Sequence, residues 1–269
     1  MLTLKEVQEV ETGILEAFHQ YCEENGLRYC MTYGTLIGAA RHRGFIPWDN
    51  DIDLYMPRPD YDRLIEQLKE KPMGPHYKLL HYSLDHKFRY MAARIVDTRT
   101  AAVPSYLRET PDDLGVWIDL FAVDGCWEHP LRHPVYWTAL SFNKMMQRAY
   151  TYYLPGKKGW KNAAKKVLMT IFRGQDNRYQ ARADKWARKC DYASHQKVTD
   201  ITDWTRRDYS VYLTHEDFDE AVLMDFEGRK FYAPKDYDRF LRSVYGEYMT
   251  LPPESERTTH DLEVEWRKD

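Results

Sequence analysis

The feature that most constrains the fold is the alternating segment from Asp51 to Met56. It reads Asp-Ile-Asp-Leu-Tyr-Met, so every second residue is fully apolar. Successive side chains of a strand point to opposite faces of a sheet, and the pattern therefore predicts a strand. We expect Asp51 and Asp53 to leave one face of this strand while Ile52 and Leu54 enter the core.

Strand and helix signals alternate through the first half of the chain, which predicts an α+β fold with helices packed on a mixed sheet. A capping box at Thr3 and Glu6 predicts the start of a first helix, and Gly26 predicts its end. Turn residues at 227–229 separate two short strand-like segments and predict a hairpin. Further strands are expected at residues 27–32, 78–81, 89–96 and 116–123, and further helices after Gly34, Pro57 and Pro234. We find neither a repeat nor a low-complexity linker, so we interpret residues 1–269 as a single domain.

Composition excludes several classes of protein. The chain has 269 residues with 8 Trp, 21 Tyr and 10 Phe, which are too many aromatic residues for a disordered protein. No segment approaches the roughly 18 uninterrupted apolar residues of a spanning helix, and the first residues lack the pattern of a signal peptide. We therefore expect a cytoplasmic protein. The four cysteines form no Cys-x-x-Cys pair, and we interpret them as reduced, structural thiols.

Positive charge is concentrated in the middle of the chain. The net charge is -3, yet residues 129–175 contain nine Lys or Arg and no Asp or Glu. Because the pattern there is helical, we interpret residues 130–198 as a basic helical insertion that suits anions such as phosphates or lipid head groups. Our hypothesis is that residues 157–173 visit the anionic inner face of a membrane, and a solvated helix that covers the core is the alternative. The lysines concerned are Lys157, Lys158, Lys161, Lys165 and Lys166.

Three segments together predict a site for phosphoryl transfer. Two carboxylates about 6–7 Å apart along the acidic strand can share a hard divalent cation, which prefers oxygen ligands. Upstream, Gly34 and Thr35 begin a short predicted helix, whose unpaired N–H groups would receive a phosphate. Downstream, Asp119 lies in an otherwise apolar strand, where an unpaired charge would be costly to bury. We expect Asp119 at the site, with a salt bridge or a strand-end cap as the alternative, and we interpret Asp124 as a cap or turn residue.

These segments resemble the LicD-type phosphotransferase family, whose members have the nucleotidyltransferase fold and include the fukutin-related proteins. The first match is Tyr-Gly-Thr-Leu-Ile-Gly-Ala-Ala-Arg at residues 33–41, and the second is Gly-Phe-Ile-Pro-Trp-Asp-Asn-Asp-Ile-Asp at residues 44–53. Ile-Asp-Leu-Phe at residues 118–121 resembles the strand that carries the family's third acid. A C-terminal pattern at residues 226–260, with His260 at its end, also matches, whereas the basic middle of the chain does not.

The resemblance implies a nucleotidyltransferase-like sheet and a metal-dependent phosphotransferase. Its implied reaction moves phosphocholine from CDP-choline to a hydroxyl of a cell-surface glycan precursor, as in lipopolysaccharide or teichoic acid modification, and releases CMP. Asp51 and Asp53 would hold Mg²⁺, or Mn²⁺, with Asp49 and Asp119 completing the acidic cluster. Asp51 and Asp53 of the acidic strand can hold the metal without Asp119, so Asp119 is our choice of general base. The family's central aspartate is Asn50 here, and strand alternation predicts that it faces away from these acids.

Further substrate contacts are predicted around the same strand. Gly34 and Thr35 should contact phosphate, and so should Arg41 in view of the family match. Arg94 would bind a diphosphate, with an ion pair at a sheet edge as the alternative. Trp48 lies beside the acids and is the best-placed aromatic residue to hold a choline group through cation–π attraction.

Two alternatives to the choline reaction stay open. One keeps the chemistry and changes the donor to another CDP-alcohol, such as CDP-ribitol or CDP-ethanolamine. The other is a catalytically silent scaffold that binds a nucleotide or glycan, against which the intact acidic residues argue. The expected partners are thus a CDP-alcohol and a glycan acceptor, often carried on a membrane lipid in such pathways, and not nucleic acid.

Overall fold

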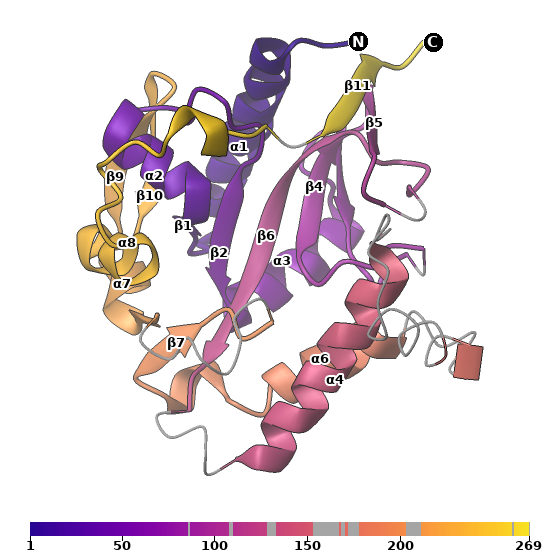
Figure 1. Ribbon diagram of the computed structural model, residues 1–269, viewed down its shortest axis with the longest axis vertical. Helices are drawn as coiled ribbons and strands as arrows, with labels where there is room; N and C mark the ends of the chain where they lie inside the picture. Colours follow the sequence, from indigo (N-terminus) through magenta and orange to yellow (C-terminus); the bar gives the residue numbers. More distant parts are fainter. Residues whose placement is uncertain are drawn as a thin grey trace.

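The structure, a computed structural model, describes residues 1–85, 87–107, 110–127, 133–152, 167, 170–171, 178–202, 211–259 and 261–268. Helices pack around a mixed sheet, which confirms the predicted α+β class (Figure 1). The helical middle of the chain lies toward one end of the sheet, and the C-terminal hairpin contacts the edge strand β1.

The acidic strand lies inside the sheet and not at its edge. The strand order is β1–β2–β6–β4–β3, and β7 pairs with the end of β6 and with β8. Strand β2 runs parallel to β6, and the other pairings in this sheet are antiparallel. The strands are β1 (Cys30–Met31), β2 (Asp53–Pro57), β3 (Tyr77–Leu80), β4 (Ala93–Asp97), β6 (Val116–Gly125), β7 (Lys197–Thr199) and β8 (Leu213–Thr214).

Local signals set the bounds of the first helix, α1 (Leu4–Asn25). Thr3 and Glu6 form the predicted capping box, and Gly26 ends the helix in a left-handed conformation with φ 60°. The apolar side of α1 packs against β6 and β4, and its Leu15 is inaccessible to solvent. Burying one such side chain stabilises a fold by about 1.5–3 kcal/mol.

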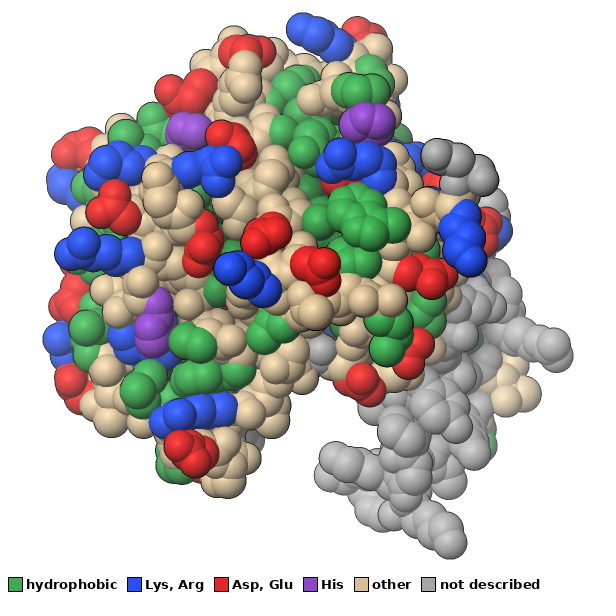
Figure 2. All heavy atoms as spheres, turned by 90° about the horizontal axis from the view of Figure 1, so that it is seen from above, with side chains coloured by type: hydrophobic (Ala, Val, Ile, Leu, Met, Phe, Trp, Pro, Cys, Tyr) green, Lys and Arg blue, Asp and Glu red, His purple; other side chains and the backbone are tan. Residues whose placement is uncertain are grey.

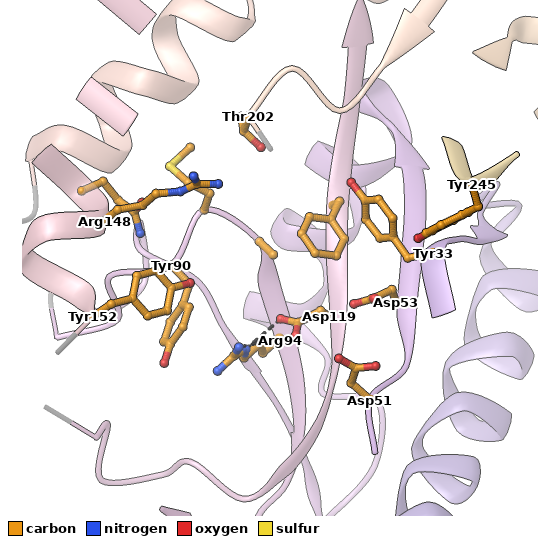
Figure 3. A pocket seen from close by; sticks show the side chains of 14 residues that line it. Tyr33, Asp51, Asp53, Tyr90, Arg94, Asp119, Arg148, Tyr152, Thr202 and Tyr245 are labelled. Atoms are coloured by element: carbon orange, nitrogen blue, oxygen red, sulfur yellow. Dashed lines mark hydrogen bonds and ion pairs between the residues drawn. The ribbon is translucent and has the colours of Figure 1, made fainter. Parts of the chain in front are cut away.

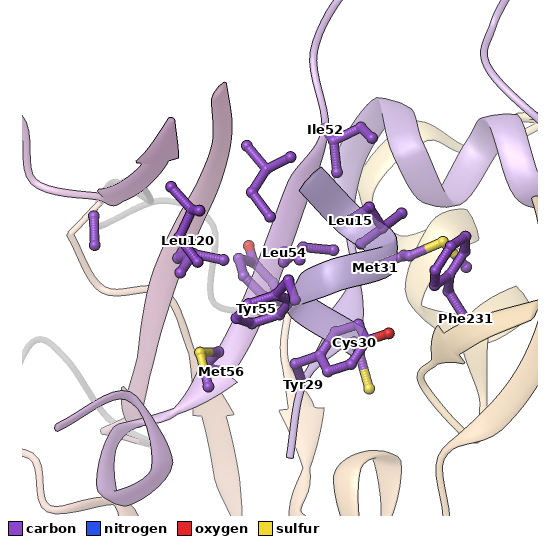
Figure 4. Close-up of a cluster of buried hydrophobic side chains, with 14 of the residues drawn as sticks. Leu15, Tyr29, Cys30, Met31, Ile52, Leu54, Tyr55, Met56, Leu120 and Phe231 are labelled. Carbon is purple, nitrogen blue, oxygen red and sulfur yellow. The ribbon is translucent and has the colours of Figure 1, made fainter. Parts of the chain in front are cut away.

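The apolar face of the acidic strand forms the centre of the core. Ile52 and Leu54 are inaccessible to solvent, as predicted, and Leu54 is paired with Leu120 of β6. Figure 4 shows these side chains beside Leu15 of α1. The other sequence-predicted helices of this half are α2 (Tyr33–His42) and α3 (Arg58–Glu70), which both contact β2.

Two helices of the middle segment, α4 (Pro134–Thr151) and α6 (Arg178–Ala187), pack on each other around a small apolar cluster. A buried ion-pair network joins α6 to the sheet. Arg58 Nε donates to Asp124 Oδ1 and Arg58 Nη1 donates to Asp184 Oδ1, both at 2.8 Å. Asp124, which we interpreted as a cap or turn residue, is therefore an ion-pair partner inside the protein.

The proposed membrane segment lies mostly outside the described residues. This applies to its five lysines and also to His260. Val167 and Ile171 are described, and they are 57% and 66% exposed. In the described parts of the chain, no helix combines the length and the apolar character needed to span a membrane. Seen from above, described Lys and Arg side chains are interspersed with Asp and Glu over the surface (Figure 2).

The C-terminal part contains both predicted and unpredicted elements. The predicted hairpin is β9 (Val222–Phe226) with β10 (Arg229–Ala233), and the predicted helix is α8 (Tyr237–Tyr245). Strands β5 (Thr100–Pro104) and β11 (Leu262–Trp266) pair with each other, which the sequence analysis did not foresee. Short elements α7 (His215–Asp219), η2 (Tyr192–Ser194) and η3 (Glu254–Glu256) complete the described chain. All four cysteines are buried and unpaired, as expected.

Candidate active site

Strand register brings two aspartates and an arginine into one row across three strands. Asp53 of β2 is paired with Asp119 of β6, and Asp119 is paired with Arg94 of β4. Residues paired in register point to the same face of a sheet, here the face opposite to that of the buried Leu54. Asp51 precedes β2 by two positions, and its carboxylate lies near that of Asp53 (Figure 3).

These four side chains line a cavity of about 360 Å³. Tyr33 of α2 and Tyr245 of α8 lie on one side of it, and Arg148 of α4 and Tyr152, which directly follows α4, lie on the other (Figure 3). The other lining residues are Tyr90, Met91, Ala92, Phe121, Gln147 and Thr202. The cavity thus combines carboxylates, aromatic rings and two arginines, and its volume suits a small phosphorylated ligand.

Asp119 is held by two neighbours. Arg94 Nε donates to Asp119 Oδ1 at 2.7 Å, and the Trp117 indole N–H donates to Oδ2 at 2.8 Å. The Arg94 guanidinium lies 3.8 Å from the ring centre of Tyr90 and 4.2 Å from that of Trp117. Burial by itself lowers the pKa of Arg94, but the Asp119 carboxylate, together with Tyr90 and Tyr106, more than offsets this and raises that pKa above its usual value. Asp119 and Arg94 therefore line the cavity and also form the ion pair that we had considered as the alternative.

Arg94 keeps one donor for a further acceptor. Its Nη1 is buried and has no hydrogen-bond partner among the residues that the structure describes. Arg94 borders the large cavity and also a second one of about 70 Å³. Because an unpaired buried donor is costly, an oxygen of a bound anion would be stabilised beside this nitrogen.

Asn50 does not face away from the acids as predicted. It borders the smaller cavity together with Asp51 and Asp119. The prediction assumed that strand alternation extends back to residue 50. Strand β2 begins only at Asp53, so the alternation does not apply there.

Gly34, Thr35 and Asp49 support the acidic strand from behind the cavity. A Cβ atom on Gly34 would lie 2.5 Å from Asp49 Oδ2, so glycine allows this aspartate to approach the start of α2. The Thr35 hydroxyl accepts a hydrogen bond from the Asp53 N–H at 2.8 Å. Gln8 of α1 donates to the Asp49 carbonyl at 2.7 Å. None of the three lines the described cavity, and their contact with phosphate or metal stays a prediction.

Arg41 and Trp48 also lie away from the cavity lining. Arg41 Nη1 donates to the Tyr248 carbonyl at 2.8 Å. The ring of Trp48 is covered by the Arg257 guanidinium, 5.0 Å from the ring centre. Both residues join the motif loop to the C-terminal part of the chain, and their contact with substrate stays a prediction.

The sequence analysis missed Glu11, a residue of α1 that is only 2% exposed. Burial raises the pKa of its carboxyl well above the usual value, and the nearby Asp51, Asp49 and Asp119 carboxylates raise it further. Its Oε2 has no hydrogen-bond partner among the described residues. A glutamate within the apolar stripe of a helix was the available signal, because such a position is normally apolar.

This concentration of negative charge favours a cation. Hard divalent ions such as Mg²⁺ and Mn²⁺ prefer carboxylate oxygens, which are the kind of ligand that Asp51, Asp53 and Asp119 offer. The unpaired buried oxygen of Glu11 would also be stabilised by a nearby positive charge. Over the described ranges, no three acidic, His or Cys side chains are already gathered as ligands. A cation held by Asp119 would therefore compete with Arg94 for that carboxylate.

Helix α4 supplies a wall of the cavity that the sequence did not reveal. Gln147, Arg148 and Tyr152 come from the segment outside the family resemblance, and Tyr245 comes from α8. No local signal marked these residues beyond the basic character of the segment around Arg148. Their position depends on how α4 is anchored to the sheet.

Tyr33 has an unusual backbone conformation. It is the first residue of α2, and its φ of 46° lies in the left-handed region. A residue other than glycine costs on the order of 1–3 kcal/mol in such a conformation. Tyr55 Oη donates to Tyr33 Oη at 2.7 Å, and the Tyr33 ring meets those of Tyr55 and Phe121 edge to face. The ring is thus fixed in the wall of the cavity.

Comparison with known proteins identifies relatives of this arrangement. The family model for the LicD/FKTN/FKRP nucleotidyltransferase domain matches residues 26–118. The chain is 31% identical over 279 residues to the lipopolysaccharide cholinephosphotransferase LicD of Haemophilus influenzae, and the alignment covers 97% of each protein. It is also 45% identical over 71 residues to the human ribitol 5-phosphate transferase FKRP, which is 26% of this chain and 13% of that protein. The residues that the family model matches contain the acidic strand β2.

Proposed function

The chain belongs to the LicD family of phosphotransferases, and we propose that it transfers phosphocholine from CDP-choline to a hydroxyl of lipopolysaccharide or a similar cell-surface glycan, releasing CMP. The observation that carries the proposal is the row of Asp53, Asp119 and Arg94 along one cavity, with Asp51 beside it. The alignment with a cholinephosphotransferase over nearly the whole chain supports phosphocholine as the transferred group.

Asp51 and Asp53 would hold the divalent metal, with Asp119 and Asp49 as further ligands. When bound by these residues, Mg²⁺ or Mn²⁺ would neutralise charge on the diphosphate and help to orient it for attack. Support comes from the carboxylates that share the cavity and from the buried Glu11 beside them.

Arg94 and Asp119 have complementary roles in this proposal. The unpaired Nη1 of Arg94 would donate to a phosphate oxygen, and Arg148 would add positive charge from the opposite side of the cavity. When the Arg94 guanidinium turns toward phosphate, the Asp119 carboxylate can accept a proton. Asp119 would take the proton of the acceptor hydroxyl as its oxygen attacks phosphorus and the bond to CMP breaks.

We also propose that the enzyme is cytoplasmic and binds to the inner face of a membrane. A lipid-linked glycan would be presented there, and a basic segment is attracted to anionic head groups. Support comes from the five lysines of residues 157–173 and from the exposure of Val167 and Ile171.

The reaction is tested by incubating the purified protein with Mg²⁺, a glycan acceptor and one CDP-alcohol at a time, and measuring CMP. We expect CMP from CDP-choline to exceed CMP from CDP-ethanolamine and CDP-ribitol, and to disappear with EDTA. The Asp51→Ala protein serves as the control for contaminating hydrolases. Absence of CMP with every donor and acceptor would contradict the proposal and favour a nucleotide-binding or glycan-binding scaffold.

Ribitol phosphate is the second candidate for the transferred group. An identity of 45% to the ribitol 5-phosphate transferase within a 71-residue segment favours it. That segment covers about a quarter of the chain, whereas the alignment with the cholinephosphotransferase covers 97% of it. The donor panel separates the two candidates directly.

A further inference from the structure

The backbone of Tyr33 is strained, and the protein nevertheless has a large side chain at this position. Its φ of 46° is a value that favours glycine, yet the chain places a bulky aromatic residue there. Residues held in sparsely populated conformations cluster at ligand sites, because the surrounding structure maintains them for their function. The Tyr33 ring lines the cavity of the proposed reaction.

The neighbours of Tyr33 determine what it presents to a ligand. Its hydroxyl is engaged by that of Tyr55 at 2.7 Å, and ring centres of Tyr55 and Phe121 lie 5.3 and 5.6 Å away in edge-to-face contact. Phe121, whose ring meets that of Tyr33, also lines the cavity, and Tyr245 lies on the same side as Tyr33 (Figure 3). This side therefore offers aromatic surface, and the Asp51 and Asp53 carboxylates lie below the Tyr33 ring (Figure 3).

The opposite side of the cavity has a different character. The Tyr90 ring there is covered by the Arg94 guanidinium at 3.8 Å, and Arg148 lies close to Tyr152 (Figure 3). A ligand that spans the cavity would have its anionic part beside the arginines and its other end beside the uncharged rings. A quaternary ammonium group suits those rings, because it has no N–H to donate and is attracted to aromatic faces.

We propose that Tyr33, with Phe121 and Tyr245, forms an aromatic subsite that binds the trimethylammonium group of choline and selects choline over ethanolamine donors. This inference rests on the proposed function, since it assigns the part of the cavity that recognises the transferred alcohol. Tyr33 is then a specificity-determining residue and does not act in the chemical step.

The test compares kcat/KM for CMP release from CDP-choline and CDP-ethanolamine, which differ only in the three methyl groups. Tyr33→Leu removes the ring and retains bulk, and we expect it to lower the choline-to-ethanolamine ratio about tenfold, the order of one desolvated cation–π contact. Tyr33→Phe retains the ring and should keep the ratio. Tyr33→Gly relieves the backbone strain, so its folding is favoured, and it should show the same loss of preference as Tyr33→Leu. Tyr152→Leu, on the opposite side, should lower both rates alike.

Equal loss of both donors in Tyr33→Leu and Tyr33→Gly would overturn the subsite, and so would an unchanged ratio. Equilibrium binding of phosphocholine against phosphoethanolamine, measured by calorimetry, makes the result independent of turnover. If the wild-type protein released no CMP from CDP-choline, the proposed reaction would fail. A binding preference for phosphocholine that Tyr33→Leu abolishes and Tyr33→Phe retains would still support the subsite. Equal affinity of the wild-type protein for the two ligands would overturn it.

Discussion

Replacement of Arg94 by Met should destabilise the protein strongly, although Arg94 lies beside the proposed reaction centre and not in the apolar core. The side chains of Arg94 and Asp119 are only 6% and 13% exposed, so removing the guanidinium leaves a carboxylate with little solvent to stabilise it. Asp51 and Asp53 border the same cavity and add negative charge. Breaking a buried pair in this way costs about 3–5 kcal/mol.

A double-mutant cycle separates this charge effect from the loss of packing. Asp119→Asn alone leaves Arg94 without its carboxylate and should also destabilise by about 3 kcal/mol. The double variant removes both charges, so we expect it to cost at least about 2 kcal/mol less than the sum of the single changes. Lys78→Met is the control, because Lys78 and Asp113 form a half-exposed pair worth at most about 1 kcal/mol.

The free energy of unfolding is measured by urea denaturation in EDTA, so that no metal contributes. Additive effects of Arg94→Met and Asp119→Asn would contradict the reasoning, since they would mean that the two side chains are not coupled. A cost below about 1 kcal/mol for Arg94→Met would likewise show that solvent reaches the pair.

Four further predictions concern catalysis, membrane binding and pH. Asp51→Ala and Asp53→Ala should each lower the rate of CMP release at least about 100-fold while circular dichroism stays unchanged, and a variant with half the normal rate would exclude that residue as a metal ligand. Asp119→Asn should lower kcat more than it weakens donor binding measured by calorimetry, whereas an equal loss would indicate a ligand and not a base. Changing the five lysines of residues 157–173 to Gln should abolish sedimentation with anionic vesicles at low salt, and identical binding by both proteins would remove the membrane hypothesis. Burial lowers the pKa of His81 to about 4, below its value in the unfolded chain. The folded protein therefore keeps its full stability above about pH 6.5, where His81 is neutral in both states, and loses stability as the pH falls toward 4. His81→Gln should abolish this loss, about 2.5 kcal/mol at pH 4.5, when unfolding free energies at pH 7 and 4.5 are compared, and equal pH dependence in both proteins would refute it.

Features that depend on neighbouring residues could be read from the sequence. The bounds of α1 follow from the Thr3 and Glu6 capping box and from Gly26, whose interactions all lie within one turn of the helix. The hairpin of β9 and β10 likewise follows from its turn residues. The alternation after Asp51 identified the acidic strand together with its buried face.

Features that depend on strand pairing could not be read in the same way. The strand expected at residues 27–32 is reduced to Cys30–Met31, because only those two residues pair with β2. The β5–β11 pair joins segments that are far apart in the chain, so no turn between them could predict the pairing. Asn50 was misplaced for a related reason, since the start of β2 is set by its neighbours and not by the alternation alone.

The sequence by itself determined the α+β class, the family and the acids at Asp51, Asp53 and Asp119, because ordered motifs and local periodicity carry that information. Only the tertiary structure decided what surrounds these acids. The register of β4 on β6 made Arg94 the partner of Asp119, and the packing of α1 placed Glu11 beside the same carboxylates. The anchoring of α4 supplied the second wall of the cavity. Such contacts join residues with no sequence relation to one another, and they form because burying apolar surface and pairing charge across the whole chain stabilise one arrangement of its elements.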